Sequence, residues 1–139
     1  IPFEALDADY EIAKEAYLEY FRKMHQLFPK CKKMLMAVRN QIASSHHTLS
    51  GLLYDAVEDQ LYTTRIYDIE PIVDPMGVGD AFIAAYIHAH QKWGDKNQYS
   101  LDFSLSASAI KNTVPGDQNL VTEEEIINNM TSSGGRIQR

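Results

Sequence analysis

The chain has 139 residues, of which 45% are hydrophobic and 23% are charged. This composition predicts one soluble globular domain over residues 1–139 and excludes collagen-like, low-complexity and largely disordered chains. The net charge of -6 lacks the basic excess of nucleic-acid-binding proteins, no apolar run approaches the roughly 20 residues of a membrane span, and Cys31 has no second cysteine. We therefore expect a cytoplasmic protein without nucleic-acid or membrane partners, and a start at Ile1 rather than Met indicates a piece of a longer protein.

The first half of the chain predicts a helix followed by strands. Apolar residues recur at helical spacing over residues 9–28, and Pro29 ends the run. The continuous apolar run 34–38 predicts a strand buried on both faces, as in a parallel sheet covered by helices. After a polar stretch over 39–47, residues 49–55 and 61–68 predict a β-hairpin.

The second half predicts three helices. Residues 81–86 are apolar on every side, which indicates a helix buried inside the domain and ended by Gly94. A second helix is expected over 101–113, because the residue before Pro115 disfavours helical geometry. Thr122 and Glu125 form a capping box that predicts a third helix, and residues 131–139 read as a Ser/Gly tail. Helices alternating with strands predict an α/β fold.

The segment between the hairpin and the buried helix carries the clearest functional pattern. Gly77, Val78, Gly79 and Asp80 stand where a predicted strand gives way to a helix, so their backbone N–H groups could bind an anion at the positive helix end. The alternative is a tight turn with Asp80 as a capping carboxylate. A P-loop is excluded because no Gly-Lys-Ser/Thr follows, and a dinucleotide fingerprint is excluded because its third glycine is missing.

Residues 74–87, Asp-Pro-Met-Gly-Val-Gly-Asp-Ala-Phe-Ile-Ala-Ala-Tyr-Ile, resemble the C-terminal signature of the ribokinase/PfkB sugar kinases. Residues 107–125 are similar to the segment that covers adenine in this family. Residues 39–55, 61–65 and 112–121 resemble the branch of 2-keto-3-deoxygluconate kinases. The resemblance implies the C-terminal, nucleotide-binding part of a ribokinase-like three-layer α/β/α fold with a β-hairpin.

The activity implied by the resemblance is transfer of the ATP γ-phosphoryl group to a keto-deoxy sugar acid. In that function Asp80 is the catalytic base, and the backbone of Gly77, Val78 and Gly79 stabilises the transferring charge. Sugar acid and ATP are then the small-molecule partners, Mg²⁺ is a cofactor, and the intact protein is a homo-oligomer, whereas this chain alone is expected to be inactive. The alternatives are a kinase of another sugar or nucleoside, or a non-catalytic nucleotide-binding module.

Further site residues follow from the same resemblance. A monovalent cation, K⁺, is implied at Asp74 and at the carbonyls near Met76 and Gly116, with a simple turn role for Asp74 as the alternative. Arg39 follows the predicted buried strand, at a strand end that would open onto a binding crevice, so it could meet phosphate, and its alternative is a solvated charge. The residues that the resemblance implies around the adenine are Ala109, Asn112, Pro115 and Gly116, with a plain helix end and Pro-Gly turn as the alternative. We expect packing or surface roles for the histidines rather than a metal site, because His88 and His90 point in different directions on a helix.

Overall fold

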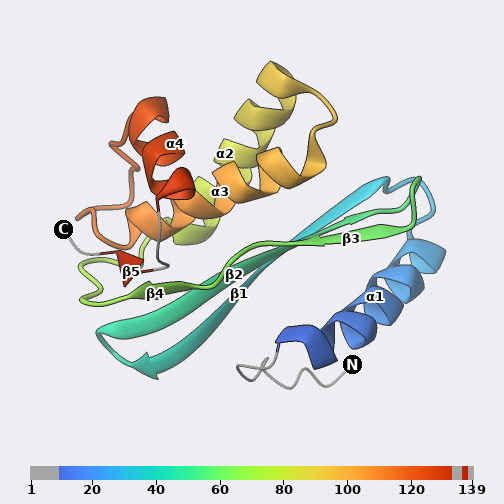
Figure 1. The fold of residues 1–139 in the computed structure, drawn as a ribbon, viewed down its shortest axis with the longest axis horizontal. Helices are drawn as coiled ribbons and strands as arrows, with labels where there is room; N and C mark the ends of the chain where they lie inside the picture. The colour runs from blue at the N-terminus through green and yellow to red at the C-terminus, as the bar shows by residue number, and fades with distance from the viewer. Residues whose placement is uncertain (1–9, 133–135, 138–139) are drawn as a thin grey trace.

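The computed structural model describes residues 10–132 and 136–137 of the chain (Figure 1). The first half runs from one helix into four strands, α1 (Tyr10–Leu27), β1 (Lys33–Ala43), β2 (His46–Asp55), β3 (Gln60–Thr63) and β4 (Tyr67–Ile69). The second half holds three helices and a short strand, α2 (Val78–Trp93), α3 (Asn97–Lys111), α4 (Glu123–Thr131) and β5 (Arg136–Ile137).

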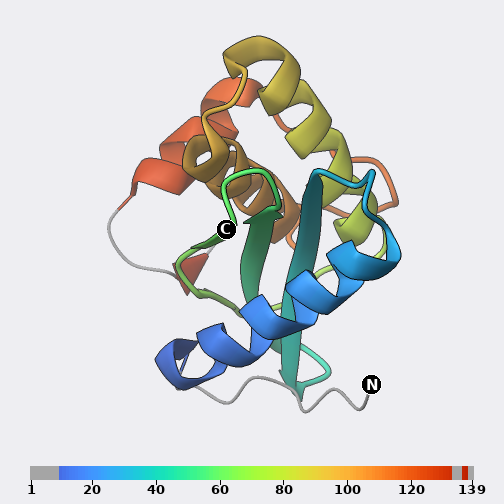
Figure 2. The ribbon, with the colours of Figure 1, turned by 90° about the vertical axis from the view of Figure 1, so that its right-hand side faces the viewer.

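The helices cover both faces of the sheet. In Figure 1, α1 lies below the strands, whereas α2, α3 and α4 lie above them, and the turned view in Figure 2 shows the same separation. Within the described residues the sheet has five strands in the order β1-β2-β4-β5, with β3 also paired to β2. The mixed helix and strand architecture predicted from the sequence is therefore confirmed, with the difference that most of its strand pairs are antiparallel.

The central strand is β2, and the prediction that residues 34–38 form the strand buried on both faces is wrong. β1 is only partly buried and pairs on its described side with β2 in antiparallel register. β2 is flanked by β1 on one edge and by β3 and β4 on the other, and its last seven residues are all buried. Both runs are apolar in the sequence, and only the long-range pairing decides which of them lies in the centre.

Alternate residues of β2 build two cores. Leu52 and Tyr54 pack with Tyr17 and Phe21 of α1, and the rings of Phe21 and Tyr54 stack at 5.7 Å. Leu49, Leu53 and Gly51 face the other way. A Cβ added to Gly51 would lie 3.3 Å from Leu101, so the glycine permits close approach of α3 to the strand.

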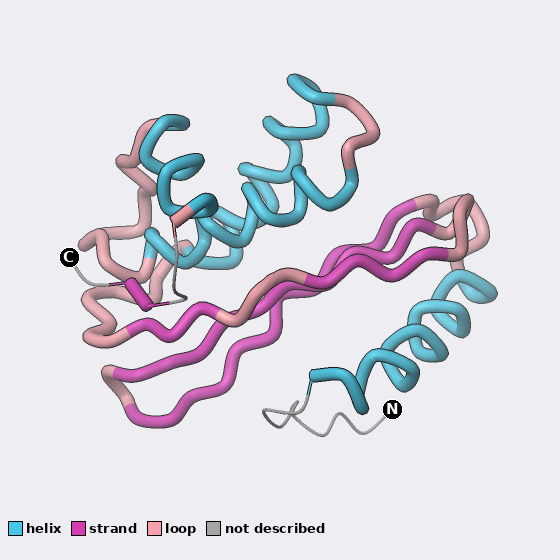
Figure 3. The backbone as a smooth tube through the Cα atoms, viewed as in Figure 1, coloured by secondary structure: helices cyan, strands magenta, loops and turns pink. Residues whose placement is uncertain are grey.

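The β-hairpin expected after residue 48 is confirmed as the β2–β3 pair. Its second strand ends at Thr63 and the chain resumes pairing as β4, so the expected strand over 61–68 is interrupted. The polar stretch 39–47 is not a loop: it extends β1 and β2 into a long hairpin, which Figure 3 shows at the lower left. Polar residues can occupy these positions because one face of the extension remains partly exposed.

The predicted helices are confirmed with shifted ends. α1 matches its expected range closely, and the Thr122–Glu125 capping box at the start of α4 forms both of its hydrogen bonds. α3 begins four residues earlier than residue 101. Residues 136–137, expected to be part of a tail, pair in parallel with β4, whereas the rest of the expected tail after Ser132 lies outside the described residues.

α3 is buried on nearly all sides although it carries many serines. Ser106 and Ser108 are completely buried, and their hydroxyls donate to the carbonyls of Ile126 in α4 and Val78 in α2 at 2.8 and 2.9 Å. A buried hydroxyl is tolerated when its hydrogen bond is made. These bonds fix α3 between the sheet and the outer helices.

Within residues 10–132, every helix is too short or too polar to span a membrane.

Candidate functional site

Two loops meet at one end of the molecule. One connects β4 to α2, where the sequence predicted a strand that leads into the helix, so that part of the prediction is wrong. The other follows α3, and both loops are drawn as pink tube at the left of Figure 3. The backbone N–H groups of Val73 and Asp74 donate to the carbonyl of Asn112 at 2.8 and 3.1 Å, and the N–H of Gly116 donates to a carboxylate oxygen of Asp74 at 2.8 Å. The structure therefore joins the two sequence segments that carry the predicted site.

Asp74 accepts a hydrogen bond with each of its carboxylate oxygens and so holds the two loops together. One oxygen accepts the N–H of Met76 at 2.9 Å and the other accepts the N–H of Gly116. These two N–H groups lower the pKa of the Asp74 carboxyl below its usual range, and the charge of Lys111 contributes in the same direction. Asp74 thus has the geometry of the turn residue that was one of its two predicted roles.

Gly77 and Val78 shape the start of α2. Gly77 is the N-cap residue with φ of 77°, and a Cβ on it would lie 2.2 Å from the carbonyl oxygen of Asp117. A side chain is therefore excluded both by the backbone conformation and by the second loop. The side chain of Val78 is buried, and its carbonyl accepts the hydroxyl of Ser108. The helix start is held rigidly from both sides.

The first turn of α2 presents free polar groups. The first N–H groups of a helix have no partner within the helix, and Val78 opens α2. Around Gly79 nothing lies within 4 Å of an added Cβ, so the space next to this backbone is open. The side chain of Asp80 is exposed, and its carboxylate makes no hydrogen bond or ion pair with the described residues. The first turn of α2 therefore carries both a carboxylate that can accept a proton and backbone N–H groups that can donate hydrogen bonds to an anion.

A groove of about 270 Å³ begins at this turn and runs between α2, α3 and the chain before α4. Its α2 side is formed by the small residues Ala81, Ala84 and Ala85, and Ala107 lies on the α3 side. Its lining is more apolar than polar, which suits a flat aromatic ring. This groove could not be predicted from the sequence, because small residues on a helix are equally typical of helix packing.

The other predicted site residues lie in different surroundings. Asn112 is the buried C-cap residue of α3, and its amide donates to the carbonyl of Ser108 at 3.1 Å. Ala109 is completely buried in the core against the sheet, so no ligand can touch its side chain. Arg39 does not follow a strand: it is an exposed residue within β1, opposite Leu49. The structure brings Asp74, Met76, the 77–80 turn, Asn112 and Gly116 together, but not Arg39 or the side chain of Ala109.

Lys111 lies at the loop junction, and the sequence pattern did not indicate it as a site residue. The last residue of α3 has no exposed surface, and its ammonium group donates to the carbonyls of Val114 at 2.9 Å and Asp74 at 3.4 Å. In the sequence this lysine looks like any charged residue at the end of a helix, where lysine is common. No local signal distinguishes it from an exposed side chain.

Two of the histidines contact carboxylates. His46 pairs with Asp68 and faces Glu70, and His88 pairs with Glu123 at 2.8 Å. The described part of the chain contains no group of three or more His, Cys, Asp or Glu side chains that could hold a metal ion.

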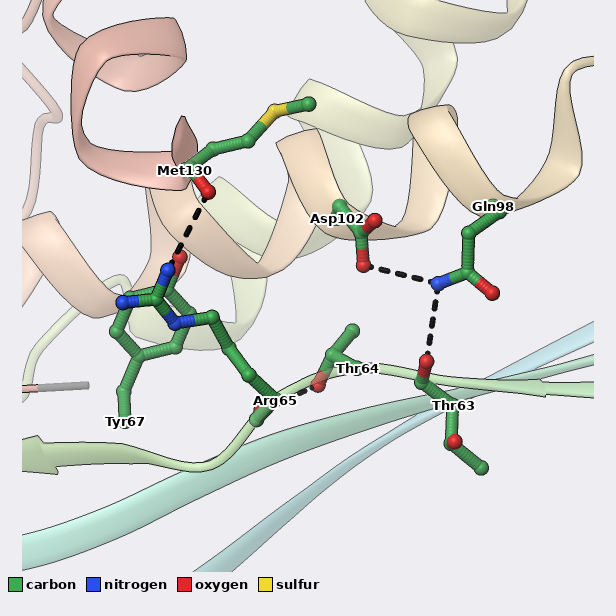
Figure 4. A pocket seen from close by; sticks show the side chains of 7 residues that line it. All are labelled: Thr63, Thr64, Arg65, Tyr67, Gln98, Asp102 and Met130. Atoms are coloured by element: carbon green, nitrogen blue, oxygen red, sulfur yellow. Dashed lines mark hydrogen bonds between the residues drawn. The ribbon is translucent and has the colours of Figure 1, made fainter. Parts of the chain in front are cut away.

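A second cavity, of about 200 Å³, lies between the β3–β4 connection and α3 (Figure 4). Its polar groups bond to one another: Gln98 donates to the carbonyl of Thr63 and to Asp102, and Arg65 donates to the carbonyl of Ser132 at 2.7 Å. Burial raises the pKa of Asp102. Asp102 stands ten residues before Asn112, about 15 Å along the helix. This cavity therefore belongs to the packing of the fold and is separate from the loop junction.

Three solved structures are similar in fold to this chain. A 2-dehydro-3-deoxygluconokinase from Thermotoga maritima is similar with a TM-score of 0.79 and 25% identity, over 93% of this chain and 37% of that one. A PfkB family carbohydrate kinase from Listeria grayi is similar with a TM-score of 0.76 and 30% identity, over 82% of this chain and 35% of that one. A structure from Enterococcus faecalis, at 19% identity and a TM-score of 0.71, supports the fold alone.

No protein-family model matches the chain, and no curated protein matches it. The chain spans about a third of the length of the solved kinases to which it is similar. The resemblance predicted from residues 74–87 is nevertheless confirmed by the structural neighbours. The chain has the fold of a part of the PfkB carbohydrate kinases, including a 2-dehydro-3-deoxygluconokinase.

Proposed function

We propose that the protein containing this chain is an ATP-dependent kinase of a keto-deoxy sugar acid, with 2-keto-3-deoxygluconate as its substrate. The observation that carries this proposal is the first turn of α2, where the carboxylate of Asp80, which has no partner among the described residues, stands beside the backbone N–H groups that open the helix. The similarity to a 2-dehydro-3-deoxygluconokinase supports the choice of substrate.

Asp80 is the proposed catalytic base. A sugar hydroxyl is a poor nucleophile, and a carboxylate that accepts its proton lets the oxygen form a bond to the γ-phosphorus while the bond to the β-phosphate oxygen of ATP breaks. The N–H groups over Gly77, Val78 and Gly79 stabilise the negative charge that moves during this transfer. The open space at Gly79 supports close approach of a phosphate to the backbone.

The groove beside α2 is the proposed site for the adenine ring. It starts at Ala81, one residue after Asp80, so a nucleotide could reach from the groove to the helix start without crossing another element. In the family resemblance the segment 107–125 covers adenine, and Ala107, Asn119 and Val121 of this segment line the groove. Mg²⁺ is the proposed cofactor, and it would neutralise phosphate charge when bound with ATP.

Sugar recognition is proposed to need residues outside this chain, which spans about a third of the matched kinases. Transfer requires the hydroxyl and the phosphate to be held in line, and a nucleotide site alone supplies no such positioning. We accordingly propose that the chain by itself does not phosphorylate sugars, whereas the intact protein does so as a cytoplasmic homo-oligomer.

The test is ADP release by two proteins, the 139-residue chain and the chain together with any segment encoded upstream of it. Both are assayed with 2-keto-3-deoxygluconate, fructose, ribose and adenosine. Selective turnover of the keto-deoxy sugar acid by the longer protein is the expected result. Turnover of another compound would replace the substrate but keep the kinase, and ATP binding without any turnover would point to a nucleotide-binding module.

A further inference from the structure

Lys111 is a buried positive charge held by backbone carbonyls. Lysine is almost never fully buried unless its charge is compensated. Here the ammonium group donates to the carbonyl of Val114 at 2.9 Å and faces the carbonyl of Asp74 at 3.4 Å. Compensation comes from these carbonyl dipoles and from the nearby carboxylate of Asp74, which the lysine charge affects.

The ammonium group of Lys111 lies in the loop junction where the cation site was expected. A monovalent cation needs several oxygen atoms that point toward one centre. Of the expected ligands, the Asp74 carboxylate already accepts the N–H groups of Met76 and Gly116, and the carbonyls of Asp74 and Val114 in the same two loops face the ammonium group of Lys111. A metal cation there would meet a fixed positive charge at its own ligands, so these residues do not fit K⁺.

We propose that the ammonium group of Lys111 is the resident cation of this loop junction and takes the place of a monovalent metal ion. It joins the loop before α2, through Asp74, to the loop after α3, through Val114. The same two loops fix Gly77 against Asp117 at the helix start. Lys111 is thus a positioning residue for the 77–80 turn, and the protein needs no K⁺ to hold this turn.

Stability measurements test the proposal without reference to kinase activity. The thermal unfolding midpoint of the full chain is measured in KCl and in tetramethylammonium chloride at equal ionic strength, because the larger ion cannot enter a carbonyl cluster. We expect the same midpoint in both salts. A midpoint that rises with K⁺ in a saturable way would overturn the proposal, since it would show that the native protein binds this ion.

The Lys111→Ala variant gives the converse test. Removal of the amine and its stem leaves the carbonyls of Asp74 and Val114 without a donor and opens room for an ion. We expect a lower midpoint in tetramethylammonium chloride and a saturable recovery with K⁺ or methylammonium. Loss of stability without such recovery would contradict the cation role and leave only a packing role.

Lys96→Ala is the matched control. Lys96 is exposed at the opposite end of α3, and its removal changes the protein charge by the same amount. We expect no K⁺-specific shift in this variant. If Lys111→Ala does not fold, the comparison of salts on the native chain still decides the proposal. Failure to find kinase activity would leave both results unaffected, because neither depends on ATP or sugar.

Discussion

Gly77 and Gly79 stand two residues apart at the same helix start but have opposite surroundings. Gly77 has a positive φ and contacts the carbonyl of Asp117, whereas Gly79 has open space around it. We expect Gly77→Ala to lower the free energy of unfolding by at least about 2 kcal/mol, and Gly79→Ala to raise it by up to about 1 kcal/mol through better helix propensity. Urea denaturation of the two variants measures both values.

The two glycine variants also separate folding from ligand binding. We expect Gly79→Ala to keep the fold intact. Weaker ATP binding by this variant would therefore show that the added methyl group obstructs the phosphate. Unchanged ATP affinity in Gly79→Ala would show that phosphate does not approach this backbone. A Gly77→Ala variant as stable as the native chain would contradict the close contact with Asp117.

His47 makes stability depend on pH. Its side chain is 4% exposed, and neither ring nitrogen has a hydrogen-bond partner among the described residues. Burial lowers the pKa of His47, and the positive charges of Arg39 and His46 lower it further. An ordinary histidine has a pKa of about 6.5, so below this pH the unfolded chain binds a proton at His47 that the folded chain does not bind. The free energy of unfolding therefore decreases as the pH falls.

The measurement is urea denaturation at pH 7.5 and pH 5.5. We expect the native chain to lose stability at the lower pH, and His47→Phe, which fills the same space without a titrating group, to lose less. The control is His88→Gln, which removes an exposed histidine on α2. An equal pH dependence in the native chain and His47→Phe would show that other groups are responsible.

At the scale of elements, α1 depends on few contacts with the sheet. Phe21 is 2% exposed and stacks on Tyr54, while the exposed Arg22 pairs with Asp59 at 2.6 Å. Arg22 and the hydroxyl of Tyr54 lower the pKa of Asp59 to about 2, but an exposed pair of this kind adds little stability. The apolar contact is therefore the main attachment of α1.

We expect Phe21→Ala to lower the free energy of unfolding by about 3–5 kcal/mol, because the cavity cannot be filled by the rigid β2 strand. Leu27→Ala is the control, since Leu27 is 71% exposed at the end of the same helix and should change stability by less than about 0.5 kcal/mol. Urea denaturation followed by circular dichroism measures both. Similar losses for the two variants would indicate general helix fraying instead of a specific contact.

Element types could be predicted where local chemistry decides them. The Thr122–Glu125 capping box needs only residues three apart, and it forms as expected. The central position of β2 could not be predicted, because it depends on which strands pair across the chain. The orientation of α3 about its own axis could not be predicted either. Ala107 and Ala109 differ by about 200° around this axis, so Ala107 lines the groove and Ala109 lies in the core.

At the scale of the whole molecule, the loop junction was predictable only through the family resemblance. Gly-x-Gly followed by Asp is compatible with a plain turn, and the run 74–87 made the kinase interpretation possible. Lys111 could not be predicted, because its burial results from two loops that meet around it. The chain covers about a third of the matched kinases, and sugar recognition by residues outside this chain is part of the proposed function.

Asp80 is proposed to remove the proton from the sugar hydroxyl, and the Asp80→Asn variant tests this role. The side chain is exposed and has no partner among the described residues, so the substitution keeps the fold and the helix start. In the chain together with any segment encoded upstream of it, we expect ADP release with 2-keto-3-deoxygluconate to fall by about 10²–10⁴-fold while ATP affinity stays within a few-fold. Turnover equal to that of the native protein would contradict the role of Asp80.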